Sequence, residues 1–159
     1  MILSKFFCAF IFIPFVVGFI QFKKLNKSHR FLYGFILVGT LSEISNKIIK
    51  EFFFFFCNMP LGHLYILISF IFLALFYLYE LKNLINKKII ISIIILYELF
   101  SLYNVIRFQS HLFYPSVPGA LSALILVTFS VLLFANILRE SKIQVLSASS
   151  LIWINSAVL

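Results

Sequence analysis

Long apolar stretches constrain this chain more than any other feature of its sequence. Each is close to the length of about 20 residues that a helix needs to cross the hydrocarbon core of a bilayer. Hydrophobic residues make up 63% of the chain and charged residues 11%, which leaves too little polar surface to cover a soluble domain. The predicted spans cover residues 2–20, 31–49, 61–81, 89–106, 117–138 and 143–159.

The sequence therefore predicts an all-α fold, a polytopic membrane helix bundle of about six transmembrane helices. Only short connections separate the spans, so residues 1–159 are expected to form a single transmembrane helical domain. Five of the spans are long. Residues 143–159 are barely long enough to cross a bilayer, and they stop at Leu159 while still apolar. The sixth helix is thus expected to be short, or truncated from a longer form.

The first stretch also has the pattern of a signal peptide, because Lys5 precedes an apolar run. The larger cluster of positive charge follows the run, however, and the sequence Gly18-Phe19-Ile20-Gln21 is not a small-residue cleavage motif. We therefore expect residues 2–20 to stay in the protein as a helix.

Basic residues collect in alternate connections between the spans. Nine of the 13 lysine and arginine residues lie in the connections 21–30, 82–88 and 139–142. Cytoplasmic loops of helical membrane proteins carry such an excess of lysine and arginine. These three connections are therefore expected in the cytoplasm, which puts the N-terminus outside.

The net charge of +8 does not by itself predict nucleic-acid binding. A basic patch on one face binds phosphate backbones, but the basic residues here are dispersed beside apolar stretches, as they are in membrane proteins. The expected partner is the lipid bilayer, with other membrane proteins as further candidates, and no nucleic acid.

One face of the second span is polar. Helical periodicity brings Glu43, Asn46 and Lys47 together on it. Glu43 and Lys47 are four residues apart in the favourable order for an ion pair. The pair has two interpretations: a self-neutralising pair near the interface, or part of a functional site. The same face also carries Gly39, Thr40 and Lys50.

The fourth span carries Glu98 near its middle. An ionisable side chain at that depth costs at least about 2.5–3.5 kcal/mol on insertion scales. We therefore expect a function or a specific interhelical bond for Glu98. Asn104 lies on a second polar face with Tyr97 and Ser101, and it fits either a binding role or packing between helices.

On the predicted threading, most of these polar groups lie in the outer half of the bundle. The sequence therefore predicts a polar cavity that opens to the exterior and is walled by the second, third and fourth spans. Its expected ligand-binding residues are Glu43, Asn46, His63, Glu98, Asn104, Arg107, His111 and Tyr114.

No catalytic residue, cofactor or metal site follows from a motif. The chain has no H-E-x-x-H, G-x-S-x-G or Walker sequence and no aspartate. The three histidines are widely separated, so a zinc site with Glu43 or Glu98 is compatible with their spacing without being required by it. Cys8 and Cys57 are expected to be apolar filler, because neither is part of a C-x-x-C pattern.

Several short motifs resemble a family of small uncharacterised multi-pass membrane proteins of the Bacteroidota. They are Phe12–Gly18 followed by Lys23-Lys24-Leu25 and Arg30, then Glu43, His63-Leu64-Tyr65, Phe113–Ser116, Leu138–Ser141 and Trp153–Ser156. Ser69 stands where that family often has an acidic residue. The resemblance implies a multi-pass protein of a bacterial inner membrane and brings no activity with it.

Three functions remain open at this level. The first is a membrane sensor or small-ligand-binding module that uses the outer polar site. The second is a membrane-embedded lipid-modifying enzyme, with His63, Glu43 or Glu98 as acid–base groups. The third is a scaffolding subunit of a membrane complex. Whether the chain is an enzyme is not decided by its sequence.

Overall fold

The computed structural model describes residues 13–52, 59–107, 114–140 and 154–156, and every regular element in these ranges is helical. This confirms the all-α prediction. Residues 13–21 are helical and lead into a short 3-10 helix, and residues 154–156 form a helical turn. The other elements are η1 (Phe22–Lys24), α2 (Lys27–Phe52), α3 (Met59–Glu80), α4 (Lys87–Arg107) and α5 (Ser116–Glu140).

Three helices in the described ranges are long and apolar enough to cross a membrane: Met59–Glu80, Lys87–Arg107 and Ser116–Arg139. They match the predicted spans 61–81, 89–106 and 117–138, and they indicate a membrane protein. Helix α2 contains the predicted span 31–49 but is not among the three. Its second half carries Glu43, Asn46 and Lys47, and these polar residues lower its mean hydropathy.

The two terminal spans lie largely outside the described residues. Residues 2–12 of the first predicted span and residues 143–153 and 157–159 of the sixth are not described. Cys8, Cys57 and Leu159 also lie outside the described residues. The structure thus supports a helical membrane protein with three candidate spans, and the count of about six stays a prediction.

The helix starts follow from local chemistry. The backbone N–H of Lys88 donates to Oδ1 of Asn86 at 3.1 Å, so the Asn86 side chain caps the start of α4. Pro60 and Pro118 lie in the first turns of α3 and α5. Proline is tolerated there because the N–H groups of a first turn have no partner within the helix.

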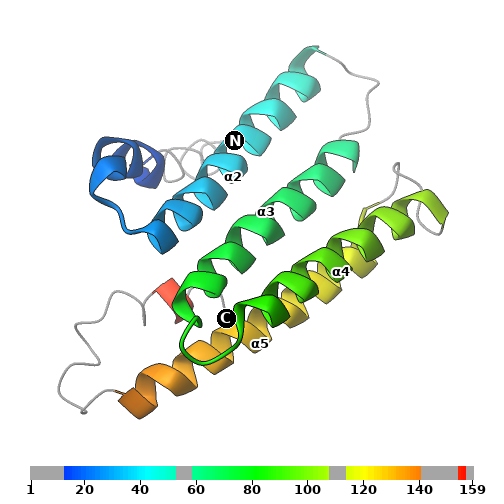
Figure 1. The fold of residues 1–159 in the computed structure, drawn as a ribbon. Coiled ribbons are helices and arrows are strands. Elements are labelled where there is room, and N and C mark those ends of the chain that lie inside the picture. Colours follow the sequence, from blue (N-terminus) through cyan, green and yellow to red (C-terminus); the bar gives the residue numbers. More distant parts are fainter. Residues whose placement is uncertain (1–12, 53–58, 108–113, 141–153, 157–159) are drawn as a thin grey trace.

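Helix α3 is the centre of the fold and contacts α2, α5 and α4. Figure 1 shows α2 beside α3 on one side, and α4 and α5 together on the other. The starts of α2 and α4 therefore lie with the ends of α3 and α5, and we name this the lysine end, after Lys27, Lys82 and Lys87. The far end holds the end of α2, the start of α3, the end of α4 and the start of α5.

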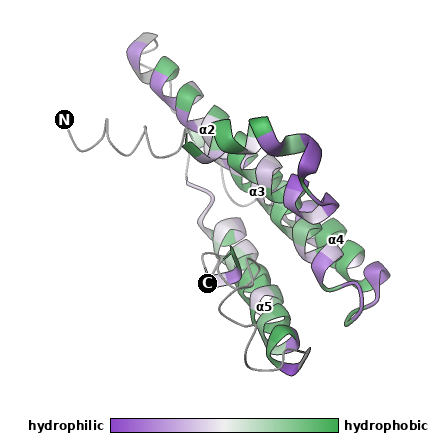
Figure 2. Ribbon diagram, turned by 90° about the vertical axis from the view of Figure 1, so that its left-hand side faces the viewer, coloured by the Kyte–Doolittle hydropathy of each residue, from purple (hydrophilic) through white to green (hydrophobic). Residues whose placement is uncertain are grey.

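Helix α4 buries polar side chains and exposes apolar ones. Ser101 and Asn104 are 2% and 6% exposed, whereas Leu96 and Ile106 are 66% and 78% exposed. Figure 2 shows that α3 to α5 are mostly hydrophobic along their lengths, with hydrophilic residues toward the helix ends. Water would disfavour this arrangement, because exposed apolar area costs roughly 25 cal/mol per Å². A lipid solvent removes that cost.

A buried polar network joins α3, α5 and the turn of residues 154–156. The Tyr77 hydroxyl donates to Asn155 Oδ1 at 3.0 Å, and the Ser130 hydroxyl donates to the same oxygen at 2.8 Å. Asn155 Nδ2 donates in turn to the Ser130 carbonyl at 2.8 Å. All three residues are fully buried. Such interhelical bonds hold membrane helices together where lipid supplies no hydrophobic driving force between them.

Two glycines allow close helix contacts. Gly18 lies against the ring of Tyr33, and Gly34 lies against the ring of Phe72. A Cβ atom at either position would overlap the ring, so the absent side chain lets the 13–21 helix approach α2 and lets α2 approach α3.

Candidate functional site

A cavity of about 530 Å³ lies between the 13–21 helix, α2 and α3 at the far end. Helix α2 contributes most of its lining, and Gly62 and Tyr65 of α3 close the other side. Among the described residues, Glu43 is the one charged residue that lines it. The full lining is Pro14, Phe35, Ile36, Gly39, Thr40, Ser42, Glu43, Asn46, Gly62 and Tyr65.

The polar face of α2 lines this cavity because its residues recur at helical spacing. Gly39, Thr40, Glu43 and Asn46 all lie on the cavity wall, as their common face predicts. The Thr40 hydroxyl already donates to the Ile36 carbonyl at 2.8 Å within the helix. The Glu43 carboxylate and the Asn46 amide therefore supply the hydrogen-bonding groups that characterise the cavity.

The polar face of α4 is used differently. The Tyr97 hydroxyl donates to the Pro118 carbonyl of α5 at 3.1 Å. The Tyr97 ring packs on the Phe70 ring of α3, with centroids 3.9 Å apart. Ser101 and Asn104 are buried on the same face. This face packs α4 onto α3 and α5.

Glu98 follows Tyr97 in the chain, so it lies beside that face, and it is partly buried. Within the described part of the chain, its Oε1 atom is buried without a hydrogen-bond partner, and so is Oδ1 of Asn104. Burying an unpaired polar atom is unfavourable. The structure therefore leaves Glu98 and Asn104 with hydrogen-bonding capacity that the described residues do not use.

Helix α3 separates the predicted site residues into two groups. His63 is buried and precedes Phe70 by seven residues, so it lies on the face of α3 that packs against α4. Gly62 and Tyr65 lie on the α2 side. Glu43 and Asn46 are thus brought together in one cavity, while His63 and Asn104 lie across α3 from them.

The remaining predicted residues lie at or beyond the helix ends. Arg107 is exposed at the end of α4, and Tyr114 is exposed just before α5. His111 lies outside the described residues. Within the described ranges, no three histidine, cysteine or acidic side chains come close enough to share a metal ion.

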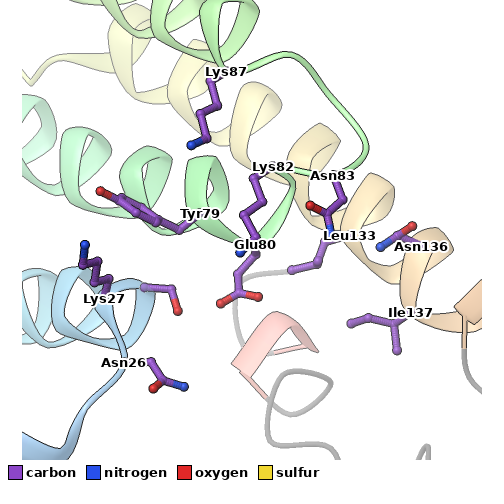
Figure 3. Close-up of a pocket in the computed structure, with 11 residues that line it drawn as sticks. Asn26, Lys27, Tyr79, Glu80, Lys82, Asn83, Lys87, Leu133, Asn136 and Ile137 are labelled. Carbon is purple, nitrogen blue, oxygen red and sulfur yellow. The ribbon is translucent and has the colours of Figure 1, made fainter.

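A second cavity, of about 580 Å³, opens at the lysine end (Figure 3). Its lysines indicate topology in the sequence, and no sequence pattern predicts the cavity itself. The contributing segments are far apart in the chain, and nothing in their spacing predicts that they meet. The lining is Asn26, Lys27, Ser28, Tyr79, Glu80, Lys82, Asn83, Lys87, Leu133, Asn136 and Ile137.

Comparison with known proteins adds no further assignment. No family model, no curated protein and no solved structure matches this chain.

Proposed function

We propose that this protein is a polytopic bundle of about six transmembrane helices that acts as a small-ligand-binding module, or membrane sensor, with its polar site in the outer half of the membrane. In this proposal the chain lies in a bacterial inner membrane with its N-terminus outside. Ligand binding changes its interaction with another membrane protein. Membership of the Bacteroidota family that it resembles belongs to the same proposal.

The observation that carries the proposal is the far-end cavity. Glu43 and Asn46 share a wall with Phe35, Ile36 and Tyr65, and this mixture of apolar lining with a few converging polar groups is typical of small-molecule sites. The cavity volume of about 530 Å³ is within the usual range for such sites.

The lining selects a class of ligand. Glu43 brings a negative charge, and no lysine, arginine or histidine lines this cavity within the described part of the chain. A ligand with a protonated amine and an apolar body matches that wall. The amine would pair with the Glu43 carboxylate and the body would lie on Phe35 and Tyr65.

Tryptamine and indole test this directly, because they share an apolar ring system and differ by an aminoethyl group. We expect saturable tryptamine binding to the full chain in mild detergent. Glu43→Gln should weaken it about tenfold, which corresponds to about 1.4 kcal/mol, and should leave indole binding unchanged. Glu51→Gln is the matched control, since Glu51 is exposed on the same helix and does not line the cavity. Equal tryptamine binding by wild type and Glu43→Gln would refute this site.

The threading is tested separately with reporter fusions at five connections. The expected compartments alternate, with Lys27, Asn86 and Ser141 in the cytoplasm and Met59 and Tyr114 outside. Fusions at Lys27 and Met59 that report the same compartment would overturn the outer position of the site, without bearing on whether the cavity binds an amine.

A further inference from the structure

The cavity at the lysine end collects charge of one sign. Its lining holds three lysines and one acidic residue, Glu80, so its side chains carry an excess of positive charge. Figure 3 shows Lys27 extending from α2, Lys82 from the connection after α3, and Lys87 from α4. Lysines from three separate segments therefore line the same cavity.

The helix starts add to this positive field. Lys27 and Lys87 are the first residues of α2 and α4, where unpaired N–H groups give a helix its partial positive charge. Lysine has the unfavourable sign at such a position, and neither first turn contains an acidic residue. An anion in the cavity would relieve both the repulsion among the lysines and the repulsion from the helix starts.

Neutral donors complete the lining. The side-chain amides of Asn26, Asn83 and Asn136 border the cavity. The Ser28 hydroxyl also borders it and is hydrogen-bonded to Nδ1 of His29 at 3.3 Å. Ammonium groups together with neutral hydrogen-bond donors bind the oxygens of phosphate groups.

The position in the fold fits the level of lipid headgroups. The cavity is bordered by the end of the candidate span Met59–Glu80 and the start of the candidate span Lys87–Arg107, so it lies where these helices leave the hydrocarbon. On the predicted threading this is the cytoplasmic side, where anionic lipids give the leaflet a negative surface potential.

We propose that the lysine-end cavity binds a phosphate group, carried either by the headgroup of an anionic phospholipid or by a free phosphate anion. The site lies at the opposite end of the bundle from the far-end cavity, and it does not depend on amine binding there. Lys27 of α2, Lys87 of α4 and Asn136 of α5 all line the cavity that holds the group.

Two double variants test the proposal with the same loss of charge. Lys27→Gln with Lys87→Gln removes two lining lysines. Lys24→Gln with Lys88→Gln removes two exposed lysines at the same end that do not line the cavity. A further variant, Asn136→Asp, adds a negative charge to the cavity and leaves every lysine in place.

Each full-length protein is incubated in detergent with phosphatidylglycerol, phosphatidylcholine or inorganic phosphate, and the bound fraction is measured by native mass spectrometry. We expect phosphatidylglycerol to bind wild type and the Lys24/Lys88 variant alike. The Lys27/Lys87 variant should bind it about 30-fold more weakly, from about 1 kcal/mol for each lysine. Asn136→Asp should also weaken phosphatidylglycerol binding.

Binding of phosphatidylglycerol that millimolar inorganic phosphate does not displace would assign the lipid as the source of the group. Saturable binding of inorganic phosphate that depends on Lys27 and Lys87, without retention of phosphatidylglycerol, would assign the free anion. Equal losses in the two double variants, or retention of phosphatidylcholine as strong as that of phosphatidylglycerol, would overturn the proposal.

Discussion

Helices α2 and α4 each carry a polar face with a glutamate on it or beside it, but the fold uses the two faces in different ways. On α4, Tyr97, Ser101 and Asn104 are almost completely buried against α3 and α5. On α2, Glu43 and Asn46 stay accessible and line a cavity. A polar face on an apolar helix is therefore ambiguous by itself. Whether a neighbouring helix covers it decides between packing and ligand binding.

The largest expected effect tests the packing role of the α4 face. Tyr97→Ala removes a buried ring that packs on Phe70 and a hydroxyl that donates to Pro118. We expect a loss of about 3–5 kcal/mol in the free energy of unfolding, measured by denaturation in detergent. Tyr97→Phe keeps the ring and should lose only about 0.6 kcal/mol.

The control for this prediction is Leu99→Ala, on the exposed side of the same helix. We expect it to change the unfolding free energy by less than about 0.5 kcal/mol. If Tyr97→Ala were as mild as Leu99→Ala, the α4 face would not be a packing surface, and the contrast with α2 would fail.

A second prediction extends the packing role to the buried network around Asn155. Asn155→Leu leaves the Tyr77 hydroxyl and the Ser130 groups without their present partner. Leaving buried polar groups unpaired costs about 1–3 kcal/mol, so thermal unfolding should occur at a lower temperature. Tyr77→Phe removes one hydroxyl, and Asn155 Oδ1 keeps its hydrogen bond from Ser130. This variant should therefore lower the unfolding temperature less than Asn155→Leu does. A larger loss of stability in Tyr77→Phe than in Asn155→Leu would contradict the central role of Asn155 in the network.

Three of the predicted spans match candidate membrane helices, and the predicted span 31–49 lies within α2. Long apolar runs between charged connections are a strong signal. The predicted span 61–81, for example, is the helix Met59–Glu80. The common face of Gly39, Thr40, Glu43 and Asn46 was also predictable, since helical periodicity alone fixes it.

The grouping of the site residues was not predictable in the same way. Topology places Glu43, His63 and Asn104 at one end of the bundle, but the rotation of α3 puts His63 on the side away from Glu43. Rotation depends on packing details such as the Gly34–Phe72 contact. The lysine-end cavity was missed for a related reason, because it forms from segments that are distant in the chain.

A third prediction compares two halves of the α2–α3 contact. Gly34→Ala places a Cβ atom against the Phe72 ring, whereas Gly62→Ala meets no atom within 4 Å. Overpacking costs about 1–3 kcal/mol, so Gly34→Ala should destabilise the protein. Gly62→Ala should be neutral or slightly stabilising, because alanine favours a helix by about 1 kcal/mol over glycine. Equal losses of stability in Gly34→Ala and Gly62→Ala would show that the α2–α3 contact is packed as tightly around Gly62 as around Gly34.

The smallest expected effect on stability is at the residues proposed to bind ligand. Glu43 is exposed on α2 and Asn46 is partly exposed, and both line a cavity and not a helix interface. Glu43→Gln and Asn46→Ala should therefore each change the unfolding free energy by less than about 0.5 kcal/mol, as surface substitutions usually do. Denaturation in detergent without ligand measures this directly. A loss of several kcal/mol at Glu43 would mean that its carboxylate holds the fold together, and α2 would then resemble α4. A small loss, combined with weaker tryptamine binding, would separate the two helices by function as well as by exposure.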